Sequence, residues 1–168
     1  MKKELEIPTV ALFCKNCFNT RRDGSAYCGN CTEERFPIYW DITKNFPMLS
    51  KVRKQFDIKL PDLENIVFTY GDTVYSYAPL SYGLVAHEIT HVLQQTKMGA
   101  EKWWKQYLKD PKFRMEQELE AYRRQYKVYC KRNARVGADM LIEMAEDLSG
   151  KIYGNIMSFD EAKQLISQ

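Results

Sequence analysis

The sequence predicts an α+β protein, in which a mainly helical domain with a small β-hairpin sheet follows a small unit organised by cysteines. Helical apolar periodicity dominates the chain after residue 79, two β-rich runs flank Gly71-Asp72, and four of the five cysteines fall within residues 14–31. The 168 residues are 45% hydrophobic and 28% charged, which is the balance of a soluble globular protein of one ordinary domain with an appendage. We therefore expect one boundary, between residues 1–36 and residues 37–168.

Charge and hydropathy exclude several classes of protein. No apolar run is long enough to cross a membrane, and residues 1–8, MKKELEIP, lack the apolar segment of a secretory signal. We therefore expect a cytoplasmic protein that has no membrane partner. A net charge of +3 is too small to indicate nucleic-acid binding by itself.

The first 36 residues are expected to form a zinc ribbon. Cys14 and Cys17 form one CxxC pair, and Cys28 and Cys31 form a second after ten intervening residues. Each CxxC turn places two thiolates side by side, so two turns supply the four tetrahedral ligands of a structural Zn²⁺. Two disulfides in a secreted protein would be the alternative, which the missing signal disfavours.

The role of this ribbon is a separate question. Lys15, Arg21 and Arg22 suit phosphate contacts, so nucleic acid is one possible partner, but Glu33 and Glu34 nearly cancel their charge. We favour a structural staple or a docking surface for a protein partner.

The segment between the ribbon and residue 79 is expected to pass from a connector to a helix and then a hairpin. Residues 36–41 are apolar and predict a connector, and Asn45 can cap a short helix over residues 46–56. Residues 66–77 contain two β-rich runs around Gly71-Asp72, a turn pair typical of hairpins.

A metal-binding motif lies on the next expected helix, which begins after Pro79 and ends at Gly99. Its sequence His87-Glu88-x-x-His91 places both imidazoles on one helical face, where they can bind one metal ion. Glu88 lies beside them, where it can take a proton from a metal-bound water. Two histidines hydrogen-bonded in a core are the alternative, but a metal satisfies all three polar groups at once.

The third ligand of this site is expected to be a carboxylate, because the sequence has only two histidines. A tyrosine or cysteine is less suitable. On a helical wheel that starts at Met115, Glu118 falls at about 300°, within the apolar sector. Glu116 and Glu120 fall at about 100° and 140°, among basic residues with which they can pair in water. We therefore predict Glu118 as the ligand, with Glu120 second.

These residues resemble a known family. The sequence His87-Glu88-x-x-His91, followed by Glu118-x-x-Ala121, looks like a small gluzincin metallopeptidase, closest to the minigluzincin domains of phage, prophage, toxin and injection-system proteins. The resemblance covers residues 45–135 and implies a zincin-like fold, a catalytic zinc held by the two histidines and Glu118, and Glu88 as general base. Larger gluzincins often have an acidic residue where this chain has Tyr122, so the partner that orients a histidine is unassigned.

The resulting functional prediction is a zinc metalloendopeptidase that hydrolyses protein or peptide substrates and holds two zinc ions, one catalytic and one structural. Glu88 acts as general base on a zinc-bound water, and Tyr122 is the candidate donor to the oxyanion. The alternative is a two-zinc binding or regulatory module, for protein or nucleic acid, whose HExxH site is not catalytic.

The rest of the chain is expected to be helical over residues 100–108, 113–135 and 138–148, with a break at Gly137 and a last helix capped by Ser158. Trp103 and Trp104 are expected in the core or a lid, and Cys130 as a buried structural thiol. A basic stripe, which we interpret as a solvated helix face, is formed by Arg123, Arg124, Lys127, Lys131, Arg132 and Arg135.

Overall fold

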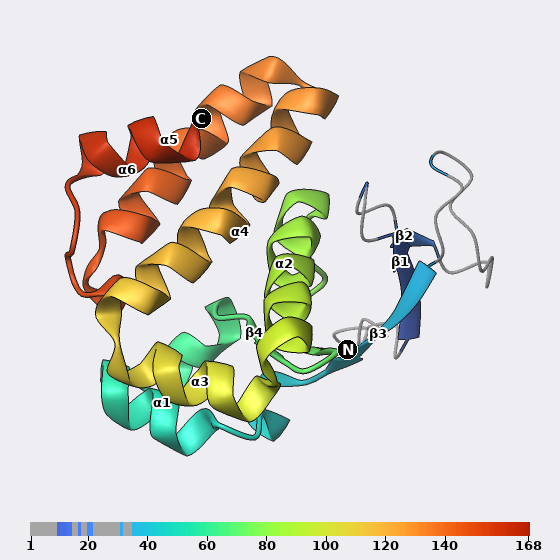
Figure 1. The fold of residues 1–168 in the computed structure, drawn as a ribbon, viewed down its shortest axis with the longest axis vertical. Helices are drawn as coiled ribbons and strands as arrows, with labels where there is room; N and C mark the ends of the chain where they lie inside the picture. The colour runs from blue at the N-terminus through green and yellow to red at the C-terminus, as the bar shows by residue number, and fades with distance from the viewer. Residues whose placement is uncertain (1–9, 15–16, 18–19, 22–30, 32–34) are drawn as a thin grey trace.

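The described part of the chain folds into six α-helices and one five-stranded sheet in a computed structural model (Figure 1). The residues described are 10–14, 17, 20–21, 31 and 35–168. The α+β class predicted from the sequence is thereby confirmed. None of the helices in this described part is long and apolar enough to cross a membrane.

The sheet joins strands from both sides of the cysteine segment, in the order β2-β1-β3-β5-β4. β3 pairs antiparallel with β1 and parallel with β5. β4 and β5 form the hairpin predicted around Gly71, whose φ of 62° is a left-handed conformation that glycine adopts without strain. The strands are β1 (Val10–Cys14), β2 (Thr20–Arg21), β3 (Arg35–Asp41), β4 (Phe68–Tyr70) and β5 (Thr73–Tyr75).

The connector predicted over residues 36–41 was wrong, because these residues form most of β3. Ile38 is fully buried and Tyr39 is 39% exposed, so neighbouring side chains point to opposite faces as in any strand. Residues 36–40 are all apolar, and this alternation was therefore not visible in the sequence. β3 also crosses the expected boundary between residues 36 and 37.

The helices follow the predicted segments with two exceptions. Ser81 caps α2 by accepting a hydrogen bond from the Leu84 N–H, and Ser158 caps α6 in the same way, as predicted, from the Glu161 N–H. The helices are α1 (Leu49–Phe56), α2 (Tyr82–Met98), α3 (Ala100–Lys109), α4 (Pro111–Arg132), α5 (Ala134–Ser149) and α6 (Phe159–Ile166). Short 3-10 turns are η1 (Thr43–Asn45), η2 (Pro61–Asn65) and η3 (Lys151–Tyr153).

Two local predictions were wrong. Asn45 does not cap α1 but ends η1, and its side chain donates to Asp41. Gly137 does not break the chain, because it lies inside α5, and the break falls at Asn133, which caps α5 through the N–H groups of Arg135 and Val136. A Cβ at Gly137 would overlap the Cys130 sulfur, so glycine is there for close packing of α4 on α5.

α2 is the central helix of the molecule and lies between the sheet and α4 (Figure 1). Ile89 and Val92 pack against Phe13 and Ile38 of the sheet. Trp103 and Trp104 of α3 are buried in a second apolar cluster, which agrees with their predicted place in the core.

Candidate metal centres

The two histidines of α2 lie side by side on its buried face. His87 is 5% and His91 is 6% exposed, and their Nε2 atoms are 3.1 Å apart. The separation of four residues produces this arrangement, since it corresponds to about one helical turn. Both Nε2 atoms therefore face the same small volume.

Glu118 of α4 completes this group of ligand atoms. Its side chain is 3% exposed, with Oε2 3.2 Å from His87 Nε2 and Oε1 3.5 Å from His91 Nε2. One donor atom from each of the three residues lies within 4.8 Å of the others. The structure thus brings together the two histidines and the glutamate predicted from the helical wheel.

The surroundings of the Glu118 carboxylate indicate that a cation fits at this position. Oε2 is buried and finds no hydrogen-bond partner among the described residues. A buried carboxylate oxygen without a partner is costly, and a cation bound at that point would remove the cost. Two imidazoles and a carboxylate are a ligand set that is compatible with zinc.

Two glutamine side chains orient the histidine rings. His87 Nδ1 donates to Gln125 Oε1 and His91 Nδ1 donates to Gln94 Oε1, each at 2.9 Å. The Gln94 amide nitrogen donates to the Gln117 carbonyl, so the amide oxygen must face His91. Because each Nδ1 donates to a glutamine, Nε2 is the ring nitrogen that each histidine can offer to a metal. Gln125 and Gln94 are thus the partners of the two histidine rings, which the sequence had left unassigned.

Glu120, the second choice for the third ligand, lies outside this group. Its carboxylate accepts from Gln94 Nε2 at 3.0 Å and pairs with Arg124 at 3.4 Å. It therefore supports Gln94 and does not reach the histidines. The apolar sector of the helical wheel distinguished Glu118 from Glu120 because one face of α4 packs against α2 and the other meets solvent.

Glu88 is held beside the histidines by a residue that sequence reasoning missed. Thr69 Oγ1 donates to Glu88 Oε2 at 2.8 Å, and both groups are buried. The Thr69 carbonyl accepts from Gln95 of α2 and Trp104 of α3, so β4 is fixed to both helices. The contact arises because the β4–β5 hairpin packs against α2, 19 residues later in the chain. No local sequence motif indicated it.

A cavity of about 450 Å³ opens on these groups and is lined by both histidines, Glu88 and Glu118. The lining from residues 52–68 is mostly apolar, and the lining from α5 and η3 is mostly polar. The apolar lining includes Val52, Phe56, Ile58, Ile66 and Phe68, and the polar lining includes Glu146, Asp147, Lys151 and Tyr153. The buried group thus borders a cavity of the size that small-molecule sites have in proteins.

Tyr122 lines the same cavity next to His87, and the two rings make an edge contact with centroids 4.6 Å apart. Its hydroxyl lies 3.5 Å from Asp147 Oδ2 and 3.4 Å from the hydroxyl of Tyr153. Burial raises the pKa of Tyr122 well above its ordinary value, so the hydroxyl stays protonated and able to donate. Its predicted role at an oxyanion stays a prediction.

In the absence of metal, His91 and Glu118 each stabilise the charged form of the other. Burial alone would lower the pKa of His91, but the Glu118 carboxylate outweighs this effect and raises the pKa from 6.5 to about 9. For Glu118, burial would raise the pKa, and the two histidines instead hold it below its ordinary value. His91 is therefore protonated at neutral pH in the absence of metal, and metal binding must displace that proton.

This ion pair predicts how stability depends on pH in chelator-treated protein. The raised pKa of His91 contributes stability that is complete below pH 6.5 and is lost as the pH rises through about 9. Urea unfolding at pH 6.5 and pH 9 should show this loss in the wild type and a smaller loss in Glu118→Gln. Equal losses would contradict the pairing, since cysteine ionisation affects both proteins alike.

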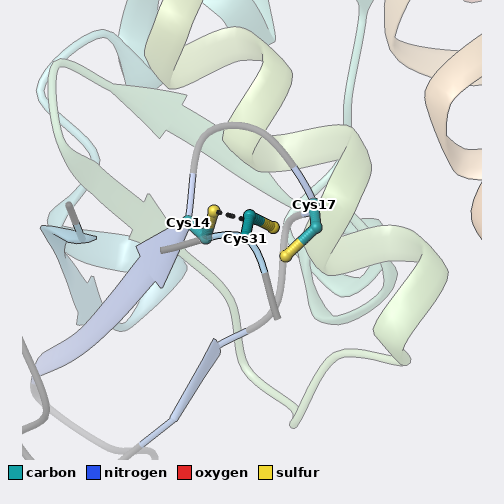
Figure 2. A group of neighbouring side chains, drawn as sticks. All are labelled: Cys14, Cys17 and Cys31. Carbon is teal, nitrogen blue, oxygen red and sulfur yellow. Dashed lines mark hydrogen bonds between the residues drawn. The ribbon is translucent and has the colours of Figure 1, made fainter. Parts of the chain in front are cut away.

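The cysteine segment holds a second candidate site (Figure 2). Sulfur atoms of Cys14, Cys17 and Cys31 lie within 4.8 Å of one another. Cys14 and Cys31 are 3.9 Å apart at sulfur, too far for a disulfide, which is about 2.05 Å long. The three are compatible with zinc, and the predicted fourth ligand, Cys28, lies outside the described residues.

Two other predicted features lie away from both centres. Cys130 is half-buried, and not buried as predicted. In the basic stripe, Arg123 donates to the Leu165 carbonyl and Arg132 lies 4.3 Å over the ring of Tyr82. Part of the stripe thus packs on its own molecule.

Comparison with protein-family models, with curated proteins and with solved structures finds no match to this chain.

Proposed function

We propose that this protein is a zinc-dependent metallopeptidase of gluzincin type, with a zincin-like helical domain and an N-terminal zinc ribbon. The observation that carries the proposal is the buried group of His87, His91 and Glu118, with one carboxylate oxygen unpartnered among the described residues, in a cavity that Glu88 also lines. A site built only to bind metal has no use for a second buried carboxylate beside the ligands. Such a carboxylate suits a general base.

In this proposal His87, His91 and Glu118 hold the zinc, which when bound supplies Lewis acidity for the scissile carbonyl and for a water molecule. Glu88 accepts a proton from the attacking water and later transfers it to the leaving amine. The Thr69 hydrogen bond fixes one oxygen of Glu88, so the orientation of the base is set before substrate arrives. Tyr122 is proposed to donate to the oxyanion.

The experiment that tests the function needs no knowledge of the substrate. Zinc-loaded protein is incubated with a mixture of denatured proteins, and new peptide N-termini are identified by mass spectrometry. We expect new termini that share a local sequence preference and disappear with a chelator. Metal binding without any cleavage would favour the two-zinc binding or regulatory module instead.

Thr69→Val tests the orientation of the base. Valine has nearly the shape of threonine but cannot donate to Glu88, so we expect cleavage to slow about 10- to 100-fold at unchanged zinc content. Thr69→Ser keeps the hydroxyl and should retain most of the activity. Equal rates for the valine and serine variants would contradict this role of Thr69.

A further inference from the structure

Tyr107 reaches the metal centre from α3, a helix that carries none of the predicted ligands. Its hydroxyl donates to Glu118 Oε1 at 2.6 Å, and both side chains are buried. A hydrogen bond of this length to a carboxylate is at the strong end of the range for proteins. Nothing in the local sequence of α3 indicates this contact.

The two oxygens of Glu118 are consequently unlike. Oε1 accepts the hydrogen bond from Tyr107 and lies 3.5 Å from His91 Nε2. Oε2 lies 3.2 Å from His87 Nε2 and has no hydrogen-bond partner in the described part of the chain. We propose that Tyr107 is a positioning residue that occupies Oε1 and presents Oε2 alone to the metal. Glu118 then binds the metal through one oxygen. This inference rests on the metal site of the proposed function, and on nothing in the hydrolysis itself.

Tyr107 is itself held rigidly, as a positioning residue must be. Its ring stacks on Trp103 with centroids 4.7 Å apart and planes 21° from parallel. The buried Arg114 donates to the Tyr107 carbonyl at 2.7 Å, and its guanidinium lies 5.7 Å from the centre of the Tyr107 ring. These contacts fix the place of the ring and, with it, the place of the hydroxyl beside Glu118.

Ligation by one oxygen has a chemical consequence. Three protein ligands that each give one atom leave the fourth tetrahedral position open, as a catalytic zinc requires. A carboxylate that bound through both oxygens would fill more of the coordination sphere. By this proposal Tyr107 keeps the fourth coordination position open and holds the Glu118 carboxylate in place before the metal binds.

The test compares two tyrosines that differ in what their hydroxyls bind. Tyr107→Phe removes the contact with Glu118. The matched control is Tyr129→Phe, because Tyr129 has nearly the same exposure, 6% against 7%, and its hydroxyl lies 2.8 Å from the Ser81 hydroxyl. Zinc affinity is measured by competition with a chromophoric chelator. Cobalt substitution distinguishes the sites, because thiolate-to-cobalt bands arise only from the cysteines.

We expect Tyr107→Phe to bind zinc at the histidine site about 10- to 100-fold more weakly than wild type, with altered visible bands of the cobalt form. Tyr129→Phe should match wild type in both. The proposal would be overturned if both variants bound zinc at the histidine site as tightly as wild type. It would also be overturned if both lost the same zinc affinity. Should Tyr107→Phe not fold, a crystal structure of the zinc-loaded wild type decides, since both Glu118 oxygens on the metal would also overturn it.

The outcomes separate this inference from the function. If Tyr107→Phe binds zinc normally while the wild type cleaves proteins, only the positioning role fails. If the wild type binds zinc as proposed and cleaves nothing, only the peptidase fails. If the histidine site of the wild type binds no metal, both fail.

Discussion

Glu118→Ala is expected to lose one of two bound zinc ions per chain. Alanine leaves only the two histidines, and two neutral ligands without a carboxylate hold Zn²⁺ weakly. Elemental analysis of the purified proteins should therefore give two zinc ions for the wild type and close to one for the variant. We expect the remaining zinc at the cysteine site, because its ligands lie on other elements than Glu118.

Glu120→Ala is the matched control for this loss. It removes a carboxylate two residues away on the same helix, and its contacts are with Gln94 and Arg124. We expect it to keep both zinc ions. If both variants kept two zinc ions, Glu118 would not be a ligand. If the wild type itself contained only one zinc ion, there would be no basis for a catalytic zinc site.

Glu88→Gln is expected to keep both zinc ions and to cleave about 10²- to 10⁴-fold more slowly than wild type, which is the usual contribution of a general base. Glutamine has the same shape, and its amide oxygen can still accept the Thr69 hydrogen bond. It cannot take up a proton at neutral pH. The variant therefore separates the chemistry from metal binding and from folding.

The measurement is the rate at which the new peptide N-termini accumulate, with zinc content determined on the same samples. Glu116→Gln, the same substitution at an exposed site on α4, serves as the control. Full activity in Glu88→Gln would disprove its role as base. Loss of zinc in that variant would show instead that Glu88 supports the metal site.

Packing connects the cysteine segment with the histidine site. Phe13, next to Cys14 in β1, belongs to the same buried cluster as Ile89, which lies between the two histidines on α2. β1, which contains Cys14, thus packs against α2, the helix that carries both histidines. This contact gives the proposed ribbon a structural role whether or not it also binds a partner.

The sequence by itself determined the local features of the candidate sites. The spacing of four residues between His87 and His91 places both rings on one face of any helix, and the polar–apolar division of α4 selects Glu118 over Glu120. The hairpin turn at Gly71 and the cap at Ser158 follow from backbone preferences of single residues. Each of these depends on a few neighbouring positions.

Tertiary structure decided everything that joins distant segments. Gln125, Thr69 and Tyr107 contact His87, Glu88 and Glu118 respectively across 38, 19 and 11 positions, and no periodicity within one element records such pairs. β3 was misread for the same reason, since its partners β1 and β5 lie far from it in the chain. A sequence pattern reports which face of an element is buried, but only packing determines which side chain meets it there.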